Sequence, residues 1–211
     1  MTSVAVAERP RSYTGPMAGS SDLETPELVA QARAGDTAAF TALVRTYEHR
    51  VLAICRRMLA DQREAEECAQ DAFVQAWRHL DRFQDRARFS TWIHRIAINE
   101  ALLRLRRRRS TEVSIDDTSS GESMLARVED WTSRPEEQLH QQELRRFLAE
   151  RLAHLPDPVR VAVVLRDVEG YSNQEVAELL EVSLEAAKAR IHRGRMRLRA
   201  DAQTWFRERS G

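Results

Sequence analysis

Basic side chains that could bind phosphate are the most conspicuous chemical feature of this chain, and they gather in two runs. The first, at residues 104–109, contains five arginines. The second, at residues 186–200, contains one lysine and five arginines with no acidic residue among them. Arginine binds phosphate through its charge and through paired N–H donors. Two such runs are typical of a protein that meets a polyanion at two places, whereas one run alone could be a solvated helix face.

Aromatic and basic residues alternate between Phe83 and Arg95, in the sequence FQDRARFSTWIHR. This combination suits single-stranded nucleic acid, because bases stack on aromatic rings while arginines hold the backbone. The alternative is that Phe83, Phe89 and Trp92 belong to a hydrophobic core, and for Trp92 we expect the core.

Signatures of the common enzyme classes are missing from the sequence. The seven glycines form neither a dinucleotide fingerprint nor a phosphate loop, and the six histidines form no HExxH pair. Two cysteines, Cys55 and Cys68, are too few for a disulfide scaffold and lack metal-ligand spacing. We therefore expect a protein that is not an enzyme, has no metal or cofactor, and works in a reduced, cytoplasmic compartment.

Hydropathy excludes membrane insertion, because the longest apolar runs, Val51–Cys55 and Val161–Leu165, are only five residues long. A helix that spans a bilayer needs about 20 apolar residues. The first residues also lack the basic lead and apolar stretch of a secretory signal.

A net charge of zero hides a segregation along the chain. Residues 22–109 carry 16 arginines against 13 acidic residues, and residues 138–211 carry 13 basic against 11 acidic residues. Between them, residues 110–137 carry 8 acidic residues against 2 arginines. The sequence predicts two mildly basic domains, 22–109 and 135–211, joined by a flexible acidic linker at 110–134. Residues 1–21 are expected to be a disordered extension.

The first block is predicted to be all helical, since neither glycine nor proline occurs from Asp36 to Ser120. Asp36 is expected to cap one helix, and Asp61 and Ser90 each precede another. For the helix after Asp61 we predict an inner face of eight residues: Ala65, Cys68, Ala69, Ala72, Phe73, Ala76, Trp77 and Leu80.

The second block contains a predicted helix-turn-helix. Ser172 and Glu175 have capping-box spacing, and Ser183 can cap a new helix eleven residues after Ser172. Ala177 is small enough for the two helices to cross there. A glycine is usual at the turn position that Glu181 occupies, and an ordinary helical hairpin is the alternative. The predicted core is Val176, Leu180, Val182, Ala187 and Ile191, and the second helix buries Ala187, Ile191 and Leu198.

Three stretches in order, Asp71–Phe83, Phe89–Arg109 and Gly170–Arg199, resemble the group-four, extracytoplasmic-function class of bacterial sigma factors. The resemblance covers about residues 25–205. It implies an all-α protein whose first domain melts the −10 promoter element and whose second domain reads the −35 element in duplex DNA. Leu103 stands where many members carry aspartate.

The resemblance also implies roles for individual residues. Residues that contact the −35 element are expected to be Ser183, Glu185, Ala186, Lys188, Arg190, Arg193 and Arg197. Residues that contact the −10 element are expected to be Arg86, Arg88, Phe89, Ser90, Arg95, Asn99, Arg104 and Arg106, with a flipped base between Phe83 and Ser90. Residues that bind polymerase are expected to be Asp71, Phe73, Gln75, Ala76, Trp77, Leu80 and Phe83.

The implied partners are core RNA polymerase, through its beta-prime clamp helices and beta flap, promoter DNA in duplex and single-stranded form, and an anti-sigma factor. A stand-alone helix-turn-helix regulator is the alternative function. It would explain residues 135–205 but would leave Asp71–Phe83 and the aromatic and basic stretch without a role. A nucleic-acid enzyme would need clustered carboxylates or a metal set, which the sequence lacks.

Overall fold

Helices make up the architecture, as the sequence predicts. The computed structural model describes residues 26–83, 88–112 and 135–209, with the backbone alone at 109–112 and 135–142, and these residues form no strand. The extension at 1–21, linker residues 113–134 and Arg86 lie outside the described residues. The elements are α1 (Pro26–Arg33), α2 (Thr37–Met58), α3 (Gln62–Arg78), the 3-10 turn η1 (Leu80–Arg82), α4 (Phe89–Glu112), α5 (Pro135–Ala153), α6 (Asp157–Val163), the π-helical turn η2 (Val164–Val168), α7 (Asn173–Leu180) and α8 (Leu184–Arg209).

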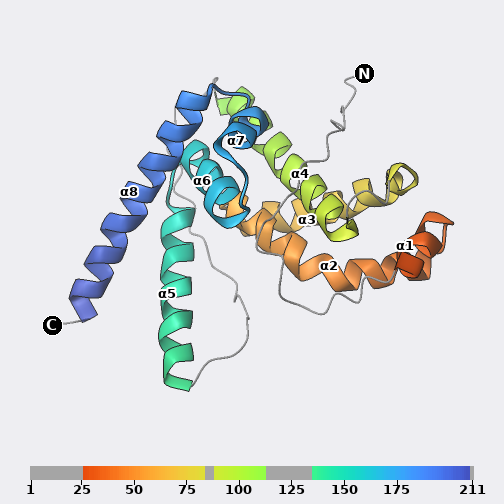
Figure 1. The fold of residues 1–211 in the computed structure, drawn as a ribbon, viewed down its shortest axis with the longest axis horizontal. Coiled ribbons are helices and arrows are strands. Elements are labelled where there is room, and N and C mark those ends of the chain that lie inside the picture. Colours follow the sequence, from red (N-terminus) through yellow and green to blue (C-terminus); the bar gives the residue numbers. More distant parts are fainter. Residues whose placement is uncertain (1–25, 84–87, 113–134, 210–211) are drawn as a thin grey trace.

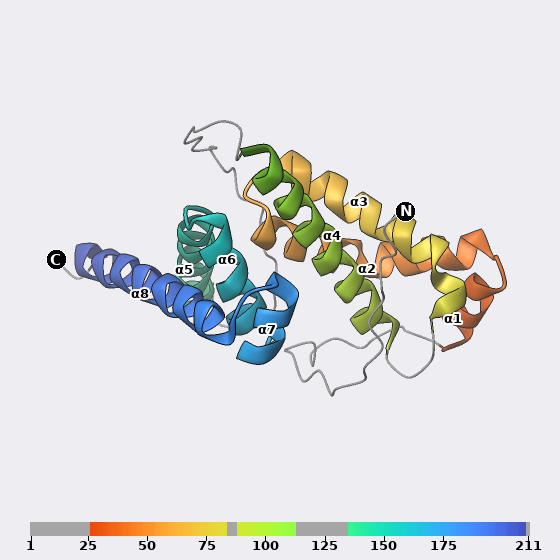
Figure 2. The ribbon, with the colours of Figure 1, turned by 90° about the horizontal axis from the view of Figure 1, so that it is seen from above.

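The helices form two groups that lie against each other. Helices α1–α4 pack together on one side, and α5–α8 pack together on the other, with α5 beside the long α8 (Figure 1). The view from above shows the same division (Figure 2). The predicted acidic linker at 110–134 falls between α4 and α5, but α4 continues through Glu112, so residues 110–112 are helical rather than linker.

Capping residues set the starts of the first helices. The Asp36 carboxylate accepts hydrogen bonds from the backbone N–H groups of Ala38, at 2.8 Å, and Ala39, at 3.2 Å. Asp61 accepts from the N–H of Glu64 at 2.7 Å. The predicted N-cap at Asp36 is confirmed, and a helix follows Asp61 as expected. The third helix, α4, is expected after Ser90 but begins at Phe89, so Ser90 lies inside its first turn. Gly35, at φ +96°, provides the left-handed residue that ends α1 and turns the chain into α2.

Small residues on α3 allow α2 and α4 to approach it closely, because Ala65, Cys68, Ala69, Ala72 and Ala76 are all buried there. Trp77 is an exception to the predicted inner face. Its side chain is 38% exposed and its ring lies 4.8 Å from that of Phe40. One face of α3 has room for small side chains only, so the large indole remains at the edge.

Aromatic rings close the core where α4 begins. The Phe89 ring lies between that of Tyr47, tilted at 5.6 Å between ring centres, and that of Phe83, edge-to-face at 5.9 Å. The Trp92 ring lies 5.2 Å from that of Phe83. Phe83 and Phe89 are buried, and Trp92 is partly buried against the core. In this structure the three rings therefore fill a core.

The helix-turn-helix is formed by α7 and α8. Ser172 and Glu175 make the predicted capping box, and Ser183 accepts a hydrogen bond from the N–H of Ala186 at 3.1 Å. Val176, Ala177, Ala187 and Ile191 are buried, while Leu180 and Val182 are partly buried. Glu181 adopts the left-handed conformation, at φ 54° and ψ 47°, that glycine adopts at lower cost.

Gly194 brings α8 against α6, a contact that the predicted stripe of Ala187, Ile191 and Leu198 did not include. A Cβ atom at this position would lie 2.3 Å from Cγ2 of Val163 and 3.0 Å from Cγ1 of Val159. The backbone of α8 can thus approach α6 this closely only because residue 194 has no side chain.

The two helical groups are joined through the buried guanidinium of Arg160, on α6. It donates two hydrogen bonds to the carbonyl oxygen of Met58, at 3.1 and 3.2 Å, and one to that of Leu155, at 3.0 Å. It also donates to Ala153 O at 3.4 Å and pairs with Asp157 at 2.6 Å. Met58 ends α2 and Ala153 ends α5, so one cation meets the negative ends of two helices. Burial lowers the pKa of Arg160, and Asp157 opposes this shift.

A second buried group, Glu169, follows the π-helical turn. Its carboxylate lies 2.9 Å from Nε2 of His94, on α4, and accepts a hydrogen bond from Arg57, on α2, at 3.4 Å. The backbone N–H of Glu169 donates to Val164 O, five residues earlier. The wider π turn changes the helical register and so turns the Glu169 side chain toward the first group.

Replacing Arg160 with methionine is expected to lower the free energy of unfolding by about 3–5 kcal/mol, because several buried carbonyl oxygens lose their donor. Chemical denaturation measures this effect. The exposed Arg199→Met variant serves as the control and should stay within about 0.5 kcal/mol of the parent. Equal stability of the two variants would contradict a joining role for Arg160.

Gly194→Ala is expected to destabilise the protein by up to about 2 kcal/mol, since overpacking costs about 1–3 kcal/mol and the gain in helix propensity offsets about 1 kcal/mol of it. Adding Val163→Ala removes the clashing atom and should restore part of the loss in urea unfolding. A Gly194→Ala variant more stable than the parent would contradict the close approach.

Candidate nucleic-acid interface

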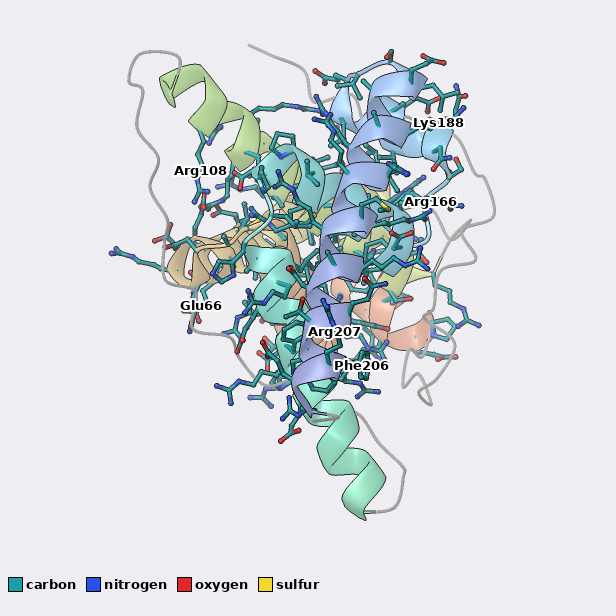
Figure 3. The ribbon with its side chains drawn as sticks, turned by 90° about the vertical axis from the view of Figure 1, so that its left-hand side faces the viewer. Glu66, Arg108, Arg166, Lys188, Phe206 and Arg207 are labelled. Carbon is teal, nitrogen blue, oxygen red and sulfur yellow. The ribbon has the colours of Figure 1, made fainter. Side chains whose placement is uncertain are left out.

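Helix α8 carries the second basic run on an exposed surface. Lys188, Arg193, Arg195, Arg197 and Arg199 are exposed, and Arg190 is half-buried. Figure 3 shows Lys188 near one end of α8 and Phe206 and Arg207 near the other. Among the predicted −35 residues, Ser183 and Glu185 are exposed at the start of the helix and Ala186 is partly exposed.

Helical periodicity separates these cations into two rows. The buried stripe of α8 is formed by Ala187, Ile191 and Gly194. With 3.6 residues per turn, one flank of this stripe carries Lys188, Arg195 and Arg199, and the other carries Arg190, Arg193 and Arg197. Glu185, Ala189, His192 and Met196 lie opposite the stripe, and the sequence analysis did not select the last three. The regular spacing of Ala189, His192 and Met196 along α8 could have identified them from the sequence.

One member of the first row is held within the protein. Arg195 forms an ion pair with Asp167, in η2, using Nε and one terminal nitrogen. The hydrogen bond that Arg195 donates to Asp167 raises the pKa of Arg195. This pair fixes α8 to the turn that precedes the helix-turn-helix.

Helix α4 presents three of the predicted −10 residues in a single row. Arg95, Asn99 and Arg106 are exposed, and their spacing of four and seven residues places them on one face. Arg88, just before the helix, is exposed as well. Phe89 and Ser90 are buried at the first turn, so their side chains do not reach this face.

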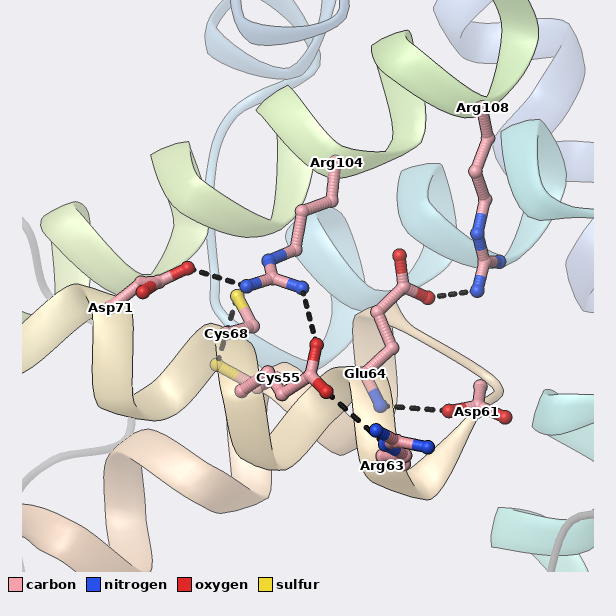
Figure 4. A network of polar contacts seen from close by, with 9 residues as sticks. Cys55, Asp61, Arg63, Glu64, Cys68, Asp71, Arg104 and Arg108 are labelled. Atoms are coloured by element: carbon pink, nitrogen blue, oxygen red, sulfur yellow. Dashed lines mark hydrogen bonds and ion pairs between the residues drawn. The ribbon is translucent and has the colours of Figure 1, made fainter. Parts of the chain in front are cut away.

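Arg104 lies on the opposite side of α4 and faces α3. It forms ion pairs with Asp71, at 2.5 Å, and with Glu67, at 3.5 Å (Figure 4). Burial lowers the pKa of Arg104, but its hydrogen bonds to Asp71 and Glu67 and the negative charges around it together raise the pKa above its usual value. The structure therefore separates Arg104 from the row formed by Arg95, Asn99 and Arg106. Instead, Arg104, a predicted −10 residue, is paired with Asp71, a predicted polymerase-binding residue.

The α4 row borders the second helical group. Arg106 pairs with Glu181 at 2.9 Å and donates to the carbonyl oxygen of Leu179 at 3.1 Å, so it contacts the turn of the helix-turn-helix. Arg95 hydrogen-bonds Tyr171, whose pKa is raised by burial and lowered in part by this arginine. Two residues beyond Arg106 toward the linker, Arg108 pairs with Glu64 and lies 3.8 Å from Asp157.

The predicted polymerase-binding residues are divided between surface and core. Asp71 and Trp77 are exposed, Phe73 and Gln75 are half-buried, and Ala76, Leu80 and Phe83 are buried. Val74, which the sequence analysis did not select, is 46% exposed and lies one helical turn before Trp77. The position of this apolar residue outside the predicted inner face could have identified it from the sequence.

No helix in the described residues is both long and apolar enough to cross a membrane. The same residues contain no group of three or more histidine, cysteine, aspartate or glutamate side chains that could hold a metal ion.

Comparisons with known proteins agree with this arrangement. Residues 43–111 match the family profile of Sigma-70 region 2, and residues 146–198 match that of Sigma-70, region 4. The first segment covers most of α2 through α4, and the second runs from α5 into α8.

Whole-chain relatives carry the same description. The ECF RNA polymerase sigma factor SigW of Bacillus subtilis is 33% identical over 174 residues, which cover 81% of this chain and 92% of the relative. The ECF RNA polymerase sigma-E factor of Escherichia coli K12 is 33% identical over 180 residues, covering 83% and 93%. The sigma factor RpoE of Bartonella quintana, solved with the anti-sigma factor NepR, shares the fold at a TM-score of 0.53 and 22% identity, over 78% of this chain and 96% of that one.

A stand-alone helix-turn-helix regulator would not account for the match over residues 43–111, which lies outside the helix-turn-helix. Both halves of the chain, in their order, match one family of transcription initiation factors. The chain therefore belongs to the extracytoplasmic-function class of sigma-70 factors and directs RNA polymerase to promoters.

Proposed function

We propose that this sigma factor contacts promoter DNA through two surfaces, the α4 row of Arg95, Asn99 and Arg106 and the flanks of α8. The observation that carries the proposal is the alignment of these side chains on exposed helix faces. The domains expected at 22–109 and 135–211 each supply one surface. The protein acts as a non-catalytic subunit of polymerase in the cytoplasm.

For the −35 element, the two basic rows of α8 suit a helix in the major groove. A helix in that groove has phosphates on both sides and base edges in front of it. Arg193 and Arg197 on one flank and Lys188 on the other would meet the phosphates. Glu185 and Ala186, at the start of the helix, would face the bases, and Ser183 would hold the helix N-terminus in place.

For the −10 element, the α4 row offers two cations and one amide to single-stranded DNA. Arginine holds the phosphate backbone, and the asparagine side chain can donate to and accept from a base edge. Arg86 and Arg88, before the helix, would add backbone contacts. Phe83, Phe89 and Ser90 would support a flipped base from beneath the row. Arg104 contributes by fixing α4 to α3.

For polymerase, the exposed apolar pair of Val74 and Trp77, next to Phe40, supports a docking surface for the beta-prime clamp helices. Exposed aromatic residues are enriched where proteins associate. The second domain would contact the beta flap. An anti-sigma factor that covers α3 would compete with polymerase, and the fold shared with a sigma factor solved with its anti-sigma factor supports this partner.

The contact between Arg106 and Glu181 adds a condition to promoter binding. Arg106 cannot pair with Glu181 and with a phosphate through the same donors. Arg106 must therefore separate from Glu181 before the α4 row is fully available. Polymerase binding would supply the free energy for this separation.

The overall test combines core polymerase capture with run-off transcription. The purified chain should bind core polymerase without DNA and should initiate transcription only from promoters of its own class. Specific binding to duplex DNA in the absence of polymerase, with no polymerase capture, would contradict the proposal.

Replacing both Arg193 and Arg197 with alanine is expected to weaken promoter binding at all sequences. The slope of log K against log salt should fall by about 1 for each lost phosphate contact. Filter binding of the holoenzyme over a range of salt concentrations measures this slope. Arg207→Ala, near the far end of α8 (Figure 3), is the control and should keep the parent slope. An unchanged slope in the double variant would remove this flank from the DNA surface.

Replacing Val74 and Trp77 with alanine is expected to weaken core polymerase binding by at least tenfold, because buried aromatic anchors contribute about 2 kcal/mol or more at interfaces. Fluorescence titration of labelled sigma factor with core polymerase measures the affinity. Met196→Ala, which removes another exposed apolar side chain on α8, should bind core polymerase like the parent. Equal binding by both variants would exclude this part of α3 from the polymerase interface.

A further inference from the structure

Cys55 and Cys68 face each other where α2 crosses α3, and no role proposed above uses them. Both are free thiols with no exposed surface, and Cys55 Sγ donates to Cys68 Sγ across 3.6 Å (Figure 4). A disulfide bond has a length of about 2.05 Å, so the sulfurs would need to approach by roughly 1.5 Å. This approach requires the two side chains to rotate and the helices that carry them to shift.

The surroundings make the two thiols unequal. The hydrogen bond from Cys55 and the positive charge of Arg104 lower the pKa of Cys68 despite its burial. The same hydrogen bond and burial raise the pKa of Cys55. The thiolate, which is the nucleophile, therefore forms at Cys68 and has a second thiol beside it.

Ion pairs cover this site from the solvent side. Arg104 lies over Cys68 and is held by Asp71 and Glu67, both of which are more than half exposed (Figure 4). One layer of side chains thus separates the sulfur from water. Brief local opening of such a layer admits a small neutral reagent, while the carboxylates disfavour bulky anions.

We propose that Cys55 and Cys68 form a dithiol modification site that hydrogen peroxide converts to an intramolecular disulfide, with Cys68 oxidised first. The Cys68 thiolate attacks one peroxide oxygen, the O–O bond breaks, hydroxide leaves, and a sulfenic acid forms. Cys55 sulfur then attacks the sulfenic sulfur, the S–O bond breaks and the S–S bond forms. In total, two thiols lose two hydrogen atoms, and one peroxide is reduced to two waters.

Arg104 is a positioning residue in this reaction, because it acts through the Cys68 thiolate. Removing its charge is expected to raise the pKa of Cys68 and to lower the thiolate fraction, by about tenfold for each pKa unit. Arg104→Gln should therefore slow the oxidation, and Arg104→Lys, which restores the charge, should recover most of the rate. A purely structural role for Arg104 predicts no such difference between glutamine and lysine.

The experiment treats the full-length reduced protein with hydrogen peroxide or with oxidised glutathione and follows both thiols by mass spectrometry. Peroxide should remove the mass of two hydrogen atoms and link the peptides of Cys55 and Cys68, and a dithiol reductant should reverse both changes. Oxidised glutathione, which is bulky and anionic, should react far more slowly. In Cys55→Ala, a sulfenic-acid trap should label Cys68, whereas in Cys68→Ala it should leave Cys55 unlabelled.

Two results would overturn the proposal. The first is that the native protein keeps both thiols under peroxide while the urea-unfolded chain forms the disulfide readily. The second is preferential labelling of Cys55, which would reverse the assigned order. The first result is measured on the wild-type protein, so the proposal can be overturned even if a variant fails to fold.

Discussion

The buried guanidinium of Arg160 is the constraint on which the relation between the two helical groups depends. A cation with 1% exposure must have its donors satisfied, and the acceptors of its hydrogen bonds lie at the ends of α2 and α5, in the loop after α5 and at the start of its own helix. Burying such a charge is costly unless its hydrogen bonds are complete. Because two of them end on Met58 of α2, the second group cannot move away from the first without exposing this arginine to water or leaving it unpaired.

The other contacts across the boundary follow from this arrangement. With α6 fixed against the end of α2, the π-helical turn directs Glu169 between His94 and Arg57. The helix-turn-helix turn then reaches Arg106 on α4. The α4 side chains that we assign to DNA thus lie at the border between the two groups, and promoter binding through them is coupled to how tightly the groups are joined.

Sequence reasoning succeeded wherever the controlling interactions are local. Asp36, Asp61, Ser172 and Ser183 each cap a helix within three residues along the chain, so their role can be read from spacing. It failed for Arg160, whose main partner is 102 residues away, and for Gly194, whose role is set by Val163 on another helix. Periodicity cannot identify a contact between helices whose packing angle is unknown. A lone arginine in the apolar stretch PVRVAVVL was the one visible hint.

The residue at the position of Glu181 indicates how the corresponding turn is stabilised in other chains. Its left-handed backbone conformation costs a residue with a side chain about 1 kcal/mol relative to glycine. That side chain is also what reaches Arg106. A chain with glycine at this position would gain a relaxed turn and lose the ion pair between its halves. The residue at this position therefore distinguishes two kinds of turn. With glycine the turn has little backbone strain, whereas with glutamate it is strained but forms an ion pair with a distant helix.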